Sequence, residues 1–257
     1  MLRNDSYAGK YIGGYHISLE LAASASSHIF LGESVSPDRH SAAIKRIDAI
    51  SLLSRQDMES FLSEVDALKQ LKHPSILPLL SAYILKGKPY IVSVYASNGS
   101  LHDRLQRQVP EPIAQDEAIL ILSQVGQALH YAHQRDRIHG NLKPQNILFT
   151  SKGDALLADF KLTSLSSSPD NSTSISPNGL PYMSAEQIEG VNSKENDQYS
   201  LGCIAYEMFT GRKPFTTPSI EQPGATTCPA LWDALRDVTD PEIPISVVDM
   251  GLIVALQ

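Results

Sequence analysis

The sequence is poor in cysteine and lacks a long apolar run. Its 257 residues include only two cysteines, Cys203 and Cys228. Two cysteines provide no disulfide framework and are typical of a reducing compartment. No apolar run approaches the roughly 18 residues of a membrane-spanning helix, and the N-terminal residues show no apolar signal region. These absences predict a cytoplasmic protein without a membrane span.

The sequence also lacks an excess of basic residues. It has 21 Lys and Arg residues against 28 Asp and Glu, a net charge of -7, and no basic cluster. This balance argues against nucleic acid as a partner. Hydrophobic residues make up 42% and charged residues 19%, which favours a packed core over global disorder. The length suits one large domain or two modest ones.

Apolar periodicity predicts strands early in the chain and helices later. Short runs with alternating or continuous apolar residues indicate strands, within 15–50 and at 89–95, 147–149 and 155–158. One-sided apolar stripes indicate helices, at 58–71, 113–134 and 197–210. A Ser/Thr-rich segment, 163–178, is too polar to pack and predicts a mobile loop. Strands followed by helices predict an α+β protein with two lobes.

One segment carries the most specific pattern in the chain. It reads His-Gly-Asn-Leu-Lys-Pro-Gln-Asn over residues 139–146. This resembles the catalytic loop of protein kinases, H-R-D-x-K-x-x-N. Gly140 stands where that family has Arg, and Asn141 stands where it has the Asp that accepts the substrate hydroxyl proton. Lys143 is retained and is expected to steady a transferring phosphoryl group. His139 is expected to be structural.

The resemblance extends to the residues that would hold ATP and Mg²⁺. Ala-Ala-Ile-Lys at 42–45 is similar to the strand whose Lys pairs with nucleotide phosphates, so Ala43 and Lys45 are expected at the nucleotide. Glu64 matches the helical Glu that pairs with this Lys. Asp-Phe-Lys at 159–161 stands in place of D-F-G, and Asp159 and Asn146 keep the two expected metal ligands.

The phosphate loop departs from the family pattern G-x-G-x-x-G. Ala22, Ser24 and Ser27 replace its three glycines. Side chains at these positions crowd the approach to phosphate, although Ser hydroxyls could donate replacement hydrogen bonds. The alternative is a plain β-turn with no ligand. The resemblance places the adenine ring against Val94 to Ala96, with Ser93 as the gatekeeper.

Two further segments complete the kinase-like pattern. Ser-Ala-Glu at 184–186 replaces A-P-E at the end of the activation segment, and Asp197 begins a match to the helix that supports the catalytic loop from below. The resemblance covers residues 15–215. It implies a bilobal protein-kinase-like fold with a small β-rich N-lobe, 15–97, and a truncated helical C-lobe, 98–215, after an N-terminal tail, 1–14.

The end of the chain follows another pattern. After a linker rich in Thr, Pro and Gly at 216–229, the segment 230–257 carries Asp-Pro-Glu-Ile-Pro at 240–244 and Val-Asp-Met-Gly-Leu at 248–252. Residues 231–256 resemble the start of the PaaD-like family linked to iron–sulfur assembly. A truncated fusion, a joined or frameshifted reading frame, a tail that docks on its own lobe and chance similarity remain alternatives.

Three functions follow from these patterns. The first is a pseudokinase, impaired by Asn141, with residual and weakened ATP and Mg²⁺ binding and a regulatory or scaffolding role toward an unknown protein partner. The second is a weakly active ATP-dependent Ser/Thr protein kinase, supported by Lys45, Glu64, Asn146 and Asp159. The third is an adaptor in iron–sulfur or phenylacetate-pathway assembly that acts through the PaaD-like tail.

Overall fold

The computed structural model describes most of the chain up to residue 214, and it divides the chain into two compact units. The described residues are 7, 9–24, 26–37, 39–48, 52, 54–163 and 179–214. The first unit runs to Ser97 and includes Leu162 and Thr163, and the second begins at Asn98. The predicted linker and PaaD-like segment lie outside the described residues. None of the described helices has the length and hydrophobicity of a membrane-spanning helix.

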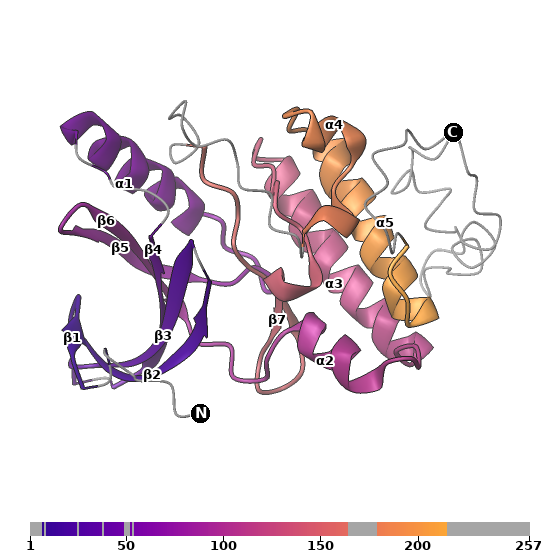
Figure 1. The fold of residues 1–257 in the computed structure, drawn as a ribbon, viewed down its shortest axis with the longest axis horizontal. Coiled ribbons are helices and arrows are strands. Elements are labelled where there is room, and N and C mark those ends of the chain that lie inside the picture. The colour runs from indigo at the N-terminus through magenta and orange to yellow at the C-terminus, as the bar shows by residue number, and fades with distance from the viewer. Residues whose placement is uncertain are drawn as a thin grey trace. The chain divides into compact units, whose positions relative to one another are not determined.

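The first unit is built on one antiparallel sheet of six strands (Figure 1). Its spatial order is β1-β2-β3-β4-β6-β5. The strands are β1 (Tyr11–Ile12), β2 (Tyr15–Ala23), β3 (Ser27–Ser34), β4 (Ser41–Ile47), β5 (Leu79–Leu85) and β6 (Lys88–Val94). Helix α1 (Arg55–Lys69) packs against β5. The pairing of β1 with β2 brings Tyr11 and Ile12, which were predicted to belong to an N-terminal tail, into the sheet.

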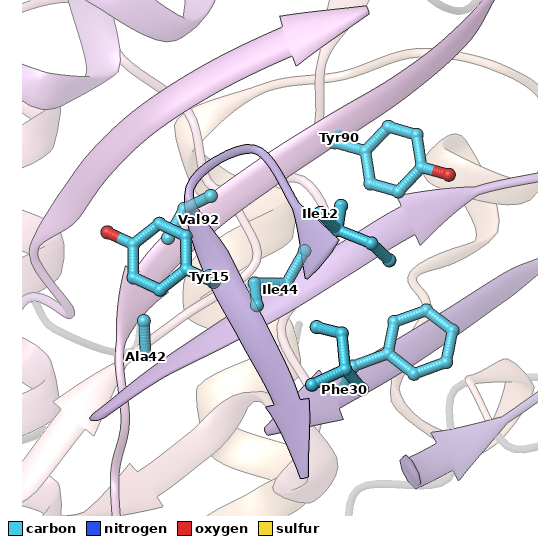
Figure 2. Packing of buried hydrophobic residues seen from close by; sticks show 8 residues of the cluster. Ile12, Tyr15, Phe30, Ala42, Ile44, Tyr90 and Val92 are labelled. Carbon is cyan, nitrogen blue, oxygen red and sulfur yellow. The ribbon is translucent and has the colours of Figure 1, made fainter. Parts of the chain in front are cut away.

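Alternation along the strands produces the core of this unit. Phe30, Ala42 and Ile44 are fully buried, and their strand neighbours on the other face are more exposed. Figure 2 shows these side chains gathered with those of Ile12 and Tyr15 from the neighbouring strands β1 and β2. Because each strand contributes one face, the sheet buries a single apolar cluster without needing long apolar runs.

The sequence periodicity missed two strands, β1 and β5, and placed the starts of α1 and α5 three residues too late. Strand β5 is half-buried at nearly every position, so its residues show no alternation between apolar and polar. It pairs with β6 through a tight turn at Lys86 and Gly87, both with positive φ. Helix α1 begins at Arg55 because the Ser54 side chain accepts a hydrogen bond from the Asp57 N–H, at 3.0 Å.

The second unit is mainly helical. Its helices are α2 (Leu101–Gln108), α3 (Gln115–His133), α4 (Ala185–Ile188) and α5 (Lys194–Thr210), and its hairpin consists of β7 (Ile147–Phe149) and β8 (Ala155–Leu157). Short 3₁₀ turns lie at Pro144–Asn146 and Leu180–Tyr182. Helix α3 packs against α5 (Figure 1). The predicted α+β class is confirmed, and so are the predicted strands at 147–149 and 155–158, the second of which ends one residue earlier, at Leu157.

Gly211 ends α5 in a conformation that other residues tolerate poorly. Its φ is 68°, and a Cβ placed there would lie 2.2 Å from the carbonyl oxygen of Pro110. Gly211→Ala is therefore expected to lower the free energy of unfolding by more than the ~1–2 kcal/mol that a left-handed backbone alone costs. Urea unfolding measures the change.

A second glycine provides the control for this prediction. Gly153 has a φ of 95°, but a Cβ there would meet nothing within 4 Å. Gly153→Ala should therefore lower the free energy of unfolding only by the cost of a left-handed backbone at alanine. If both variants lose the same free energy of unfolding, the clash of the new Cβ with Pro110 costs nothing.

Candidate functional site

One buried carboxylate on α5 binds the loop that connects α3 to β7. Asp197 is 1% exposed. Its Oδ2 accepts hydrogen bonds from the His139 N–H and from His133 Nε2, both at 2.8 Å, and its Oδ1 accepts from the Gly140 N–H at 2.8 Å. The predicted support of this loop by Asp197 is confirmed. The carboxylate fixes two consecutive peptide units, which sets the path of the chain into residue 141.

His139 has a structural role, as predicted. The side chain is fully buried, and burial lowers its pKa, which favours the neutral imidazole. Its Nδ1 accepts a hydrogen bond from the Asn141 N–H at 3.3 Å, so Nε2 carries the proton and donates to the Ala158 carbonyl at 2.8 Å. The imidazole thereby connects the loop at 139–146 to the residue before Asp159.

Three predicted site residues of this unit lie together. The Asn141 side-chain Nδ2 donates to Asp159 Oδ2 at 3.3 Å, and the Asn146 side-chain Nδ2 donates to the Asn141 carbonyl at 2.7 Å. The Ala158 N–H donates to the Asn146 carbonyl at 2.8 Å. Asp159 itself has a φ of 65°. Asn141 therefore contacts both proposed metal ligands, through its side chain and through its backbone.

These contacts bear on whether the site suits Mg²⁺. A carboxylate from Asp159 and an amide oxygen from Asn146 are hard oxygen donors of the kind that Mg²⁺ prefers. In the described part of the chain, no group of three or more His, Cys, Asp or Glu side chains could hold a metal ion. Two protein oxygens completed by phosphate oxygens and water are an ordinary Mg²⁺ set, so the donors fit. Lys143, half-buried, precedes the 3₁₀ turn at Pro144–Asn146 in the same loop.

The predicted lysine and glutamate lie on β4 and α1 of the first unit. Lys45 is half-buried and aligns with Ile29 on β3 and Ile91 on β6, while Ala43 aligns with Ser93. The pairing of Lys45 with Glu64 stays a prediction. Glu64 Oε1 accepts two hydrogen bonds from Thr163, from its N–H at 2.8 Å and from its Oγ1 at 2.7 Å. Sequence reasoning missed Thr163, because nothing distinguishes it from the other Ser and Thr residues that follow.

The turn between β2 and β3 closes on the Ser24 side chain. Ser24 Oγ accepts hydrogen bonds from the Ser27 N–H at 3.0 Å and the Ser26 N–H at 3.3 Å, while the Ser24 N–H donates to the Ser27 carbonyl at 2.8 Å. The Ser27 hydroxyl lies 3.3 Å from Ser24 Oγ. The amides that a phosphate loop would direct at a ligand thus have a partner inside the turn. Ala22 is exposed at the end of β2.

The segment predicted to receive adenine follows β6. Ser93 is buried, and Val94 is the last residue of the strand. The Val94 N–H donates to the Pro78 carbonyl at 3.0 Å, so this N–H is already bonded within the protein. Ala96 lies in the half-buried segment beyond the strand. These positions are compatible with the predicted adenine contacts, which stay predictions.

Cys203 is not a reactive candidate. It lies buried in α5, and burial raises the pKa of its thiol to about 12. The thiolate is the reactive form of cysteine, so this side chain is inert near neutral pH. Cys228 lies outside the described residues.

Comparison with known proteins places these features in a family. The family profile described as "Protein kinase domain" matches residues 26–241. The match begins after Ala22 and Ser24, and it continues past 215 into the segment predicted to be PaaD-like. Serine/threonine-protein kinase PrkC of Bacillus subtilis is 30% identical over 210 residues, which is 80% of this chain and 32% of PrkC.

Other relatives and solved structures agree with this match. CBL-interacting serine/threonine-protein kinase 21 of Arabidopsis thaliana is 32% identical over 213 residues, which is 81% of this chain and 50% of that protein. The crystal structure of the Mycobacterium tuberculosis PknI kinase domain is similar with a TM-score of 0.64 at 26% identity, covering 81% of this chain and 79% of that one. The chain spans about a third to a half of the length of the curated relatives described here. The predicted kinase-like fold, with a β-rich N-lobe and a helical C-lobe, is confirmed.

Proposed function

Because the chain belongs to the protein kinase family, we propose that it is a catalytically impaired kinase-like protein that binds ATP and Mg²⁺ weakly and acts as a regulatory or scaffolding module. One observation carries the proposal. Asn141 occupies the position of the catalytic base, and its amide Nδ2 donates to Asp159 at 3.3 Å. The side chain is therefore used as a hydrogen-bond donor, where the family's reaction needs a proton acceptor.

The loss of the base has a large expected effect on the rate. A positioned general base contributes about 10²–10⁴-fold to proton-transfer steps. An amide cannot accept the proton of a substrate hydroxyl at neutral pH, although it can orient the hydroxyl by a hydrogen bond. Lys143 remains in the loop to contact a phosphoryl group. The site is therefore better suited to bind ATP and orient a hydroxyl group than to transfer a phosphoryl group.

The closed turn at Ser24 supports weakened phosphate binding. A glycine-rich loop donates backbone N–H groups to phosphate oxygens. Here two of those groups, on Ser26 and Ser27, already donate to Ser24 Oγ. A phosphate must displace these bonds before it gains its own, so the net gain per bond is small. Adenine contacts at Val94 and Ala96 and a charge contact from Lys45 would supply most of the affinity.

Asp159 and Asn146 would hold Mg²⁺ in this protein. Bound there, Mg²⁺ would supply positive charge that offsets part of the negative charge of the phosphates. The chain's own contribution is orientation. The Asn146 amide nitrogen donates to the Asn141 carbonyl, which turns the Asn146 side-chain oxygen away from that carbonyl. The Asn141 amide supplies partial positive charge to Asp159, which weakens the attraction of that carboxylate for a cation.

A second function has a specific observation in its favour. Lys45, Glu64, Lys143, Asn146 and Asp159 are all present, and they are the remaining polar groups of the kinase reaction. They support a weakly active ATP-dependent Ser/Thr kinase as the alternative. The third function, an adaptor for iron–sulfur or phenylacetate-pathway assembly, depends on residues 231–256. These lie outside the described residues, so this function stays a prediction from the sequence.

Titration with Mg-ATP tests the proposal. We expect the wild-type protein to show a small, saturable rise in melting temperature and no transfer of radiolabelled phosphate to itself or to a generic protein. Ser24→Gly should lower the dissociation constant about five- to 150-fold, because two N–H groups become available and each net hydrogen bond contributes about 0.5–1.5 kcal/mol. Isothermal titration calorimetry measures the constant.

The control is a serine outside the turn. Ser18 lies on β2, and its Oγ donates to the Leu31 carbonyl at 3.2 Å. Ser18→Gly should leave the dissociation constant unchanged. If Ser24→Gly also leaves the dissociation constant unchanged, the closed turn does not weaken phosphate binding. Transfer by the wild type that Lys45→Ala abolishes would favour the weakly active kinase.

A further inference from the structure

Two substitutions that look unrelated in the sequence contact each other in the structure. Gly140 stands where the family has a large Arg, and Lys161 stands where it has a Gly. Gly140 is buried with a φ of 66°. A Cβ at this glycine would lie 3.3 Å from both Cβ and Cδ of Lys161. The lysine side chain therefore packs directly over the glycine, and the large and small residues have exchanged places.

The Lys161 side chain continues past Gly140 to the turn between α4 and α5. Its Nζ donates to Asn192 Oδ1 at 3.2 Å. Its backbone N–H donates to the His139 carbonyl at 2.9 Å. Lys161 thus contacts the catalytic loop through its backbone and its stem, and a third segment through its ammonium group.

The third segment also contacts the loop directly. Gln187 on α4 donates from Nε2 to the Gly140 carbonyl at 2.8 Å. On the opposite side, the Gly140 N–H donates to Asp197. Both backbone polar groups of Gly140 are therefore bonded, and the lysine stem covers its α-carbon. A larger residue at 140 would have to push the lysine stem aside and adopt a left-handed backbone.

We propose that Lys161 is a positioning residue and that Gly140 is the surface that receives it. Together with Asn192 and Gln187 they form a clamp that holds the Asp159 segment against the catalytic loop in the unmodified protein. Family members place this segment by phosphorylation of the activation loop, which an Arg at position 140 would read. The clamp makes that modification unnecessary. The inference rests on the proposed function only in taking Asp159 as a magnesium ligand.

The energy of the clamp comes mainly from packing. The hydrogen bond to Asn192 is exposed, so it contributes little in water. The methylene groups of Lys161 lie over Gly140 and exclude water from its buried backbone. The ammonium group is not needed for this packing. Loss of the Lys161 charge should therefore loosen the Asp159 segment less than loss of the methylene groups. The opposite order would be expected if the ammonium contact held the segment.

Amide hydrogen exchange of the full chain tests the clamp. Lys161→Gly should speed exchange in peptides that cover residues 157–163, on the order of tenfold, because the segment opens locally. Lys161→Met keeps the stem and should retain most of the protection. Lys152 is exposed in the β7–β8 turn, and Lys152→Gly should leave these peptides unchanged. Equal exchange in Lys161→Gly and the wild type would overturn the proposal.

A double-mutant cycle tests whether the two residues act on each other. Gly140→Ala alone should speed exchange of residues 157–163, because its Cβ crowds the lysine stem. In a Lys161→Gly background the same change should have a smaller effect, because the stem is gone. Additive effects would show that the contact carries no coupling and would overturn the pairing of these residues.

Binding of Mn²⁺, followed by electron paramagnetic resonance with ATP present, separates the clamp from the proposed function. If the clamp positions a metal ligand, Lys161→Gly weakens Mn²⁺ binding and Lys161→Met restores it. If no variant binds Mn²⁺, the metal assignment of Asp159 fails, and the exchange measurements still decide the clamp. Mn²⁺ binding of equal strength in all variants would overturn the positioning role.

Discussion

Replacement of Asn141 by Asp is expected to raise the rate of phosphate transfer from Mg-ATP by about 10²-fold or more. The new carboxylate can accept a hydroxyl proton, and it removes the amide that donates to Asp159 Oδ2. Full activity is not expected, because Ser24 still closes the phosphate turn. Transfer of radiolabelled phosphate to the protein itself and to a generic acceptor protein measures the change.

Two variants control this experiment. Gln106→Glu makes the same change from amide to carboxylate at an exposed side chain on α2 and should leave transfer at the wild-type level. Lys45→Ala added to Asn141→Asp should abolish the gain. If the wild type already transfers phosphate as fast as Asn141→Asp, the impaired function is wrong and the weakly active kinase is correct.

Asp197→Asn is expected to lower the free energy of unfolding of the second unit by about 3 kcal/mol or more. The buried carboxylate accepts three hydrogen bonds, and an amide nitrogen in place of one oxygen cannot accept any. At least one buried N–H of His139 or Gly140 is then left without an acceptor. Urea unfolding followed by circular dichroism at helix wavelengths measures the loss.

The matched control is an exposed aspartate. The Asp136 side chain is 92% exposed and pairs with Lys194 at 3.0 Å. Surface ion pairs of this kind contribute about 0–1 kcal/mol, so Asp136→Asn should change the unfolding midpoint little. If Asp197→Asn lowers the free energy of unfolding no more than Asp136→Asn does, the loop does not depend on the Asp197 carboxylate.

The sequence predicted well where a motif has fixed spacing. The catalytic loop, Asp159 and the supporting Asp197 could be placed because each is defined by residue type at a fixed distance along the chain. Strand β5 could not, because its half-buried residues show neither of the two apolar periods. The grouping of strands before helices was enough for the fold class, since it does not depend on any single element.

Side-chain contacts between segments were the hardest to predict. Ser hydroxyls in the β2–β3 turn could serve a ligand or the turn itself, and only the geometry shows that Ser24 Oγ accepts from the turn's own amides. Thr163 bonds to Glu64 across 99 positions of sequence, and Lys161 reaches Asn192 across 31. No local pattern encodes such distances, because they depend on how separate elements pack.

The support that Asp197 gives to the catalytic loop has an evolutionary consequence. The carboxylate holds the loop by the main-chain N–H groups of positions 139 and 140, which every residue except proline possesses. The side chain at 141 takes no part in that support. Inheritance of the fold and inheritance of the reaction are therefore separable in this architecture. A lineage can discard the chemistry through one codon and keep a correctly shaped molecular surface on which natural selection can act for other purposes.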